Sequence, residues 1–160
     1  MRRPVDTDAP GAALGFRRAG LADVERVMEI EKEGFLHPWS REIIERELQH
    51  AWSQVVLALD GAGGLVVGYI VFWLVHDEVH VLNVATALEA RRRGVGRALM
   101  DVAEQEGRRR GARIATLEVR SSNVPAIALY RAIGYRQVGV RPNYYAEERE
   151  DAIVMVKSLG

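Results

Sequence analysis

Cysteine is absent from this 160-residue chain, which excludes disulfides, thiolate catalysis and cysteine-based zinc sites. Long hydrophobic runs are also missing, because no apolar stretch approaches the roughly 20 residues that a membrane-spanning helix needs. The apolar stretch at residues 9–14 is interrupted by Pro10 and Gly11, and it is too short for the core of a signal peptide. We therefore expect a soluble, cytoplasmic protein with no membrane partner.

The chain also lacks an excess of charge of either sign, since 22 Lys and Arg residues balance 22 Asp and Glu residues. A neutral chain has no global field to attract nucleic acid. Arginines cluster at 91–93 and 108–110, but no aromatic residues are interleaved with them. We expect no direct nucleic-acid partner.

Candidate metal ligands are few. His76 and His80 are four residues apart, and on a strand they would lie about 13 Å from each other. Their spacing and order also differ from the HExxH zinc motif. The sequence therefore predicts no metal site.

The composition is that of an ordinary globular domain, with 48% hydrophobic and 28% charged residues. Residues 1–13 are polar and contain two prolines and a glycine, so we expect a flexible N-terminal tail. Residues 14–160 are predicted to form a single domain, as a monomer or weak dimer.

Hydrophobic periodicity predicts a mixed α/β domain. Helices are expected at 21–34, from the N-cap Ser40 to about 49, at 95–110 and at 124–132. Strands are expected at 14–18, 54–59, 65–74, 79–85, 114–119, 135–140 and 152–156. Two loops have an unusual composition. Residues 35–40 expose much apolar surface for a loop, and residues 141–151 are rich in Asn, Tyr and Glu.

The centre of the chain reads as a strand, a glycine-containing loop and an amphipathic helix. Gly94 and Gly96 lack Cβ atoms, so a ligand can lie against the main chain. The first amide groups of the helix are unpaired and lie at the positive end of its dipole. The unit is therefore suited to bind a phosphate or pyrophosphate.

Three classes of phosphate-binding loop were compared with this unit. The Walker A pattern does not occur in the chain, and the third glycine of a dinucleotide-binding fingerprint is missing. The third class is the acyl-CoA loop of the GNAT acetyltransferase family, which has Arg or Gln three residues before a glycine and a second small residue two positions later. Arg91, Gly94 and Gly96 are similar to that pattern.

Glu118 stands in an otherwise apolar predicted strand. It either faces outward at a sheet edge or acts as a general base whose pKa is raised by burial. Asn123 can cap the helix at 124–132 or bind a ligand that lies along it. Tyr130 can be a core residue with a satisfied hydroxyl or a proton donor.

A second run of residues strengthens the resemblance to the GNAT family. The residues that match the second half of the family pattern are Leu117, Glu118, Val119, Arg120, Asn123, Ala126, Leu129, Tyr130, Gly134 and Tyr135. Three further segments resemble the RimI group of that family: Phe35–Ser40, Leu82–Ala85 and Arg141–Met155. The similarity covers about residues 14–157.

The resemblance implies a GNAT fold, which is a mixed, mostly antiparallel sheet of six to seven strands flanked by four helices. It implies transfer of an acetyl group from acetyl-CoA to the N-terminal amino group of a small-subunit ribosomal protein. In the RimI group the first residue of that protein is alanine. Glu118 would be the general base and Tyr130 the general acid. The residues implied to bind acetyl-CoA are Val84, Ala85, Thr86, Arg92, Arg93, Gly94, Val95, Gly96, Arg97 and Asn123. Those expected to contact the peptide are Phe35, Trp39, Asn83 and Tyr145.

Two departures from the family pattern concern the entry to the arginine loop and the end of the central strand, and two other functions stay open independently of them. Ala87 and Leu88 replace the usual Asp-Pro or His-Pro before the arginine loop, and Thr86 replaces a common valine. The same fold could act on a small amine such as a polyamine or an aminoglycoside. A catalytically silent module that binds acyl-CoA and regulates a partner would also carry these motifs.

Overall fold

The computed structural model describes residues 14–61 and 64–160. The expected tail at 1–13 lies outside the described residues. The described helices are α2 (Val24–Gly34), α3 (Arg41–Gln49), α4 (Val95–Arg109) and α5 (Val124–Ala132). The strands are β1 (Leu14–Arg18), β2 (Ser53–Asp60), β3 (Leu65–Val75), β4 (Glu78–Thr86), β5 (Ile114–Arg120), β6 (Arg136–Tyr145) and β7 (Glu150–Ser158).

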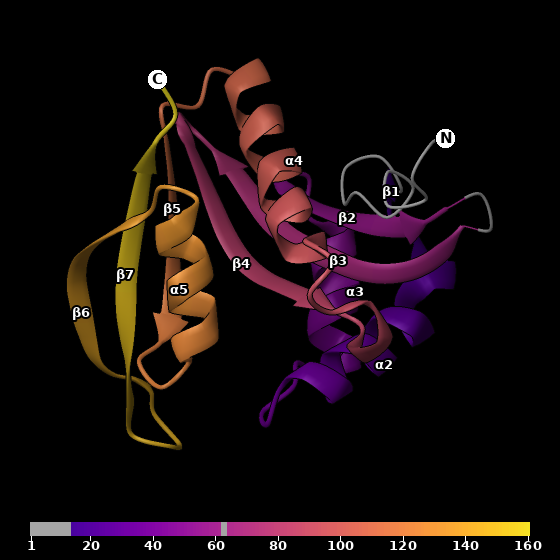
Figure 1. Ribbon diagram of the computed structural model, residues 1–160, viewed down its shortest axis with the longest axis horizontal. Coiled ribbons are helices and arrows are strands. Elements are labelled where there is room, and N and C mark those ends of the chain that lie inside the picture. Colours follow the sequence, from indigo (N-terminus) through magenta and orange to yellow (C-terminus); the bar gives the residue numbers. More distant parts are fainter. Residues whose placement is uncertain (1–13, 62–63) are drawn as a thin grey trace, which may run out of the picture. The chain divides into compact units, whose positions relative to one another are not determined.

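These strands form one sheet in the order β1-β2-β3-β4-β5-β7-β6 (Figure 1). β4 pairs with β5 in parallel, whereas β1 with β2, β5 with β7, and β6 with β7 are antiparallel. Four α-helices and seven strands in the described chain confirm the predicted mixed α/β fold.

The described chain divides into two compact units. The first contains the residues up to Phe72 together with Asn83–Ala103, and the second contains Trp73–Leu82 and Glu104–Gly160. Strands β3 and β4 and helix α4 contribute residues to both units. We describe the packing of each unit by itself.

In the first unit, apolar stripes on the helices supply the core. Val27 and Ile30 of α2 are fully buried, as are Leu57 of β2 and Phe72 of β3. Their spacing along α2 is that of one helical face, which explains why this segment folds as an amphipathic helix. Ser40 caps α3 as predicted, because its side chain accepts a hydrogen bond from the Ile43 amide at 3.3 Å.

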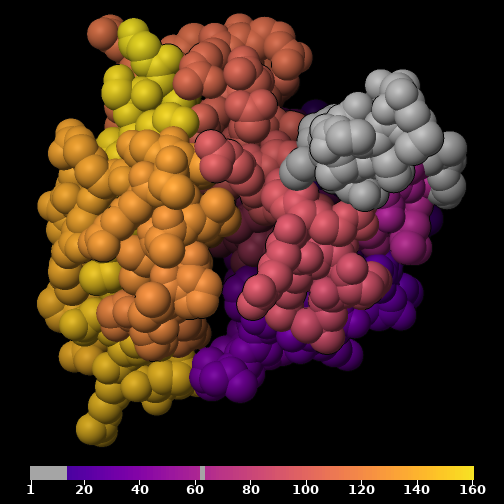
Figure 2. Space-filling model, in the orientation of Figure 1, coloured from indigo at the N-terminus to yellow at the C-terminus, as the bar shows by residue number. Residues whose placement is uncertain are grey.

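The second unit is built around β5, which pairs with β4 on one side and β7 on the other. Alternate β5 residues Ala115, Leu117 and Val119 are buried, as expected for a strand with one face on the core. Asn123 caps α5, and Gly134 follows the helix with a φ of 107°, a conformation that favours glycine. Figure 2 shows residues of α5 and β6, in orange, on the surface of this unit.

Two boundaries differ from the sequence prediction. The first turn of the predicted helix at residue 21 is a 3-10 helix, Leu21–Asp23, and α2 begins at Val24. Residues 141–145 and 150–151 were predicted as loop but belong to β6 and β7, so the loop between these strands spans only 146–149. The error arose because Pro142 and Asn143 are residue types depleted in strands, whereas β7 offers this stretch a pairing partner across a ladder with a register shift.

Candidate active site

Glu118 lies in the second unit on β5, a strand with neighbours on both sides. Its side chain is 11% exposed, and Oε1 lies 2.8 Å from Nε2 of His80 on β4. The Nε atom of Arg141 on β6 lies 3.8 Å from Oε2. Glu118 is therefore a largely buried carboxylate on an internal strand, and the alternative of an edge position is wrong.

The hydrogen bond from His80 lowers the pKa of Glu118. Burial acts in the opposite direction, and the electrostatic effects of His80 and Arg141 add to the lowering. The expectation of a raised pKa was wrong, because the sequence did not reveal these two partners. The carboxylate is therefore ionised at neutral pH, and as a carboxylate it can only accept hydrogen bonds.

His80 was considered in the sequence only as a metal ligand. Strands β4 and β5 pair in parallel, with Val81 opposite Leu117. His80 comes one residue before Val81 and Glu118 one residue after Leu117, so these two side chains lie diagonally on the same face of the sheet. The rings of Trp73 and His80 make an edge-to-face contact, nearly perpendicular to each other, with 5.8 Å between their centroids. A strand assignment with the right register could have predicted this pair.

Tyr130 lies on the buried side of α5, where its ring contacts that of Tyr135 at 6.0 Å between centroids. Burial, followed by the neighbouring Tyr145, raises the pKa of Tyr130 to about 12. The phenol is therefore protonated throughout the neutral range and can donate a proton.

Asn123 forms the N-cap of α5, since its Oδ1 accepts a hydrogen bond from the Ala126 amide at 3.2 Å. The capping role suggested by the sequence is confirmed. The amide NH₂ of an asparagine remains a donor when its oxygen caps a helix.

Tyr145 ends β6 in a cluster around Arg120. The Arg120 guanidinium carbon lies 3.9 Å from the centre of the Tyr145 ring, a cation–π contact. Nη1 of Arg120 also contacts Glu148 at 2.7 Å and Glu150 at 3.2 Å. These contacts fix the start of the β6–β7 turn against the end of β5.

The predicted acyl-CoA loop lies in the first unit, between β4 and α4. Arg92 and Gly94 have positive φ values of 65° and 76°, so the main chain turns sharply just before α4 begins at Val95. Gly68 on β3 makes room for this turn, because a Cβ atom there would lie 2.8 Å from Val95 Cγ1 and 2.9 Å from the Ala85 carbonyl oxygen.

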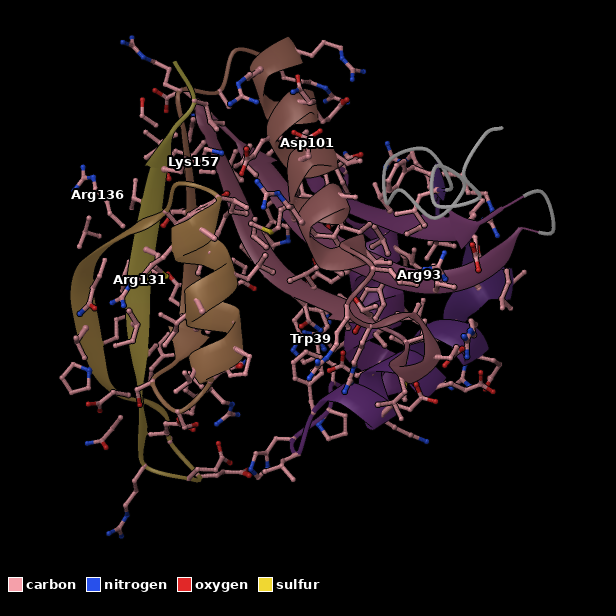
Figure 3. The ribbon with its side chains drawn as sticks, in the orientation of Figure 1. Trp39, Arg93, Asp101, Arg131, Arg136 and Lys157 are labelled. Carbon is pink, nitrogen blue, oxygen red and sulfur yellow. The ribbon has the colours of Figure 1, made fainter. Side chains whose placement is uncertain are left out.

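Arg93, which was expected to hold pyrophosphate, has its guanidinium paired with Asp60 at the end of β2. The two nitrogens lie 3.2 and 3.0 Å from the two carboxylate oxygens (Arg93 is labelled in Figure 3). This fork lowers the pKa of Asp60. The side chain of Arg93 is thus already engaged, whereas its main chain lies in the loop.

Glu31 on α2 is a buried carboxylate. Its Oε1 accepts hydrogen bonds from the Tyr69 hydroxyl and from Asn83 Nδ2, the latter at 2.8 Å. Its Oε2 accepts one from the Trp39 amide at 2.7 Å. Glu31 is 1% exposed. A glutamate among the apolar positions of a helix was the signal that could have identified it.

Two of the residues expected to contact peptide are tied to this carboxylate. The Trp39 main chain and the Asn83 side chain are hydrogen-bonded to Glu31, and the rings of Phe35 and Trp39 are half-buried. Leu36, between them, is 94% exposed. The loop thus has an anchored end next to a fully exposed apolar side chain.

The candidate residues fall into two groups. Glu118, Asn123, Tyr130 and Tyr145 belong to the second unit, and the remaining candidates, from Phe35 to Arg97, belong to the first. Among residues 14–61 and 64–160 there is no group of three or more potential metal ligands. Within the same residues no helix is both long and apolar enough to cross a bilayer.

Comparison with known proteins places these features in a family. The acetyltransferase (GNAT) family model matches residues 24–135. N-alpha-acetyltransferase RimI from Mycobacterium tuberculosis is 35% identical over 147 residues, which are 87% of this chain and 89% of the relative. The alanine N-acetyltransferase of ribosomal protein bS18 from Escherichia coli K12 is 33% identical over 140 residues, 86% of this chain and 93% of the relative.

A solved structure agrees. The crystal structure of the ribosomal-protein-S18-alanine N-acetyltransferase from Escherichia coli has a TM-score of 0.82 and 30% identity, covering 92% of this chain and 94% of that one. The chain belongs to the acetyltransferase (GNAT) family and is of the RimI type.

Proposed function

We propose that this enzyme transfers the acetyl group of acetyl-CoA to the N-terminal amino group of a ribosomal protein whose first residue is alanine. The observation that carries the proposal is Glu118, a largely buried and ionised carboxylate on the internal strand β5 of a RimI-type chain. The two relatives described above are named for N-terminal acetylation, one of them on ribosomal protein bS18.

Acetyl-CoA is bound in this proposal mainly by main-chain groups. Residues 84–86 at the end of β4 offer amide and carbonyl groups to the pantetheine arm, and residues 92–97 offer amides to the pyrophosphate. The positive φ of Arg92 and Gly94 supports the second assignment, because such turns direct successive amide groups toward one anion. The free NH₂ of Asn123 contacts the cofactor arm.

The chemistry requires an unprotonated amine. An α-amino group with a pKa near 8 is about one-tenth neutral at pH 7, whereas lysine, near 10.4, is neutral well below 1% of the time. Glu118 accepts the proton, directly or through water. Tyr130 protonates the departing thiolate, which its raised pKa permits because the phenol keeps its proton up to about pH 12. Neither a covalent acyl-enzyme nor a metal is needed.

Phe35, Trp39, Asn83 and Tyr145 are proposed to contact the peptide. Glu31 holds Trp39 and Asn83, and Arg120 holds Tyr145, so each of these three residues has a fixed position within its own unit.

The test measures CoA release from acetyl-CoA with hexapeptides that differ only in their first residue. We expect the alanine peptide to react fastest, its N-acetylated form not to react, and Glu118→Gln to lower kcat by about 10²–10⁴-fold. The matched control is Glu78→Gln, an exposed residue at the start of β4. Turnover only with polyamines or aminoglycosides would assign a small-amine substrate, and CoA binding without any turnover would mean a silent module.

A further inference from the structure

We infer that His80 is the group on which the proton of the amine finally rests, while Glu118 stays ionised beside it and holds the imidazole in place. The inference rests on the proposed acetyl transfer and revises its proton path, because His80 replaces Glu118 as the final acceptor of the proton. His80 and Glu118 are joined by a hydrogen bond of 2.8 Å between neighbouring strands of one unit.

The hydrogen-bond chemistry fixes the tautomer of His80. An ionised carboxylate can only accept, so Nε2 of His80 must carry the hydrogen that lies between the two groups. The other ring nitrogen, Nδ1, is then the acceptor of the neutral imidazole. The His80 side chain is 31% exposed, so the pair has an outlet to water.

The imidazole is more basic than the carboxylate, which favours it as the final acceptor of the proton. The α-ammonium group titrates near pH 8, imidazoles in general near 6.5 and carboxylates near 4.3. The hydrogen bond from His80 lowers the pKa of Glu118 and makes this carboxylate a still weaker base. A proton from the amine is therefore held far better by an imidazole than by Glu118 alone.

The step balances with one proton. An N–H bond of the ammonium group breaks, and an N–H bond at Nδ1 of His80 forms, directly or through water. Nε2–H keeps its bond to Oε1, and Glu118 neutralises the imidazolium. After the product leaves, Nδ1 returns the proton to bulk water.

Few other charges face the pair. Trp73 of β3 contacts the ring of His80 without adding a charge. From β6, Arg141 lies 3.8 Å from Oε2 of Glu118, and Tyr145 also interacts with that carboxylate. From β7, the residue that pairs with Glu118 is the apolar Val154. On the opposite face, Val79 packs against Gly107 of α4, which leaves the face of His80 and Glu118 turned away from this part of the helix.

The experiment compares wild type with His80→Gln, which keeps an N–H donor but cannot take up a proton. We expect kcat with the alanine peptide to fall by about 10²-fold at pH 7. The loss should shrink above pH 9, where the amine arrives already neutral. The Kd of acetyl-CoA and the thermal unfolding of the variant should stay near wild type, and the control His76→Asn, in the turn before β4, should change nothing.

Nitrogen NMR of the imidazole gives a readout that does not depend on turnover. We expect Nε2, and not Nδ1, to carry the hydrogen of the neutral ring. An active wild type with unchanged kcat in His80→Gln would overturn this inference alone, as would a hydrogen on Nδ1 of the neutral ring. A wild type that acetylates no peptide would instead overturn the proposed function.

Discussion

At the scale of single residues, the buried carboxylates have quite different partners. Glu118 faces an imidazole and a guanidinium group, whereas Glu31 accepts from a hydroxyl, a side-chain amide and a main-chain amide. Glu104 in the second unit accepts from the Tyr135 hydroxyl and from Lys157, which Figure 3 labels. Each carboxylate is satisfied by hydrogen bonds, as burial of a charge requires. Of these three carboxylates, Glu118 is the one whose partner is an imidazole.

Truncation of Glu31 should destabilise the fold. Glu31→Ala leaves the Tyr69 hydroxyl and the Trp39 amide without their acceptor, and we expect a loss of about 3 kcal/mol in the free energy of unfolding. Glu31→Gln should lose less, because one oxygen remains as an acceptor. Urea unfolding measures both changes.

The matched control for that experiment is Glu29→Ala on the same helix. The Glu29 side chain is 64% exposed and pairs with Arg26 at the surface, so its removal should change stability by less than about 1 kcal/mol. Equal losses in Glu29→Ala and Glu31→Ala would contradict the assignment of Glu31 as the anchor of Trp39 and Asn83.

At the scale of elements, the end of β4 and the start of α4 pack closely against Gly68 of β3. Gly68→Ala would place a methyl group within 2.9 Å of the Ala85 carbonyl and even closer to Val95. The main chain must then shift, at a cost of about 1–3 kcal/mol. Because Ala85 and Val95 flank the proposed acyl-CoA loop, we also expect weaker binding of CoA in calorimetry.

Gly15→Ala serves as the control, since among the described residues, its chain neighbours aside, no heavy atom lies within 4 Å of a Cβ at that position. Gly15 lies on β1, and its substitution should leave CoA affinity unchanged. If Gly68→Ala bound CoA as tightly as Gly15→Ala, the loop between β4 and α4 would not be the cofactor site.

The elements themselves were largely predictable from sequence, because periodicity and capping residues are local signals. Asn123 and Gly134 delimit α5 as expected, and Ser40 caps α3. The side-chain pairs were not predictable in the same way. His80 with Glu118, and Arg93 with Asp60, join residues that are 38 and 33 positions apart, and their contact depends on strand register. The predicted direction of the Glu118 pKa shift was wrong for the same reason.

At the scale of the whole molecule, binding of the proposed co-substrate should stabilise the folded chain. A ligand at 100 times its Kd adds about 2.7 kcal/mol to the free energy of unfolding, provided that it binds only the folded state. For a chain of this size that corresponds to a rise in Tm of roughly 5–10 °C. Calorimetry with CoA measures the shift.

Adenosine, which lacks the pyrophosphate and the pantetheine arm, is the control ligand and should leave Tm nearly unchanged. A rise with adenosine equal to that with CoA would argue against anion binding by residues 92–97. The family match supports the use of the intact chain for this measurement, because residues 24–135 include parts of both compact units.

The ion pair between Arg93 and Asp60 should also influence how ligand binding by the proposed acyl-CoA loop depends on ionic strength. Asp60 is an internal counterion that cancels one of the three consecutive arginine charges at 91–93. Salt screens exposed charges far more than it weakens main-chain amides, so the intact fork should lower the salt sensitivity of the proposed nucleotide binding. Asp60→Asn would remove this counterion, which should make binding of an anion tighter in dilute buffer and more easily lost in concentrated salt.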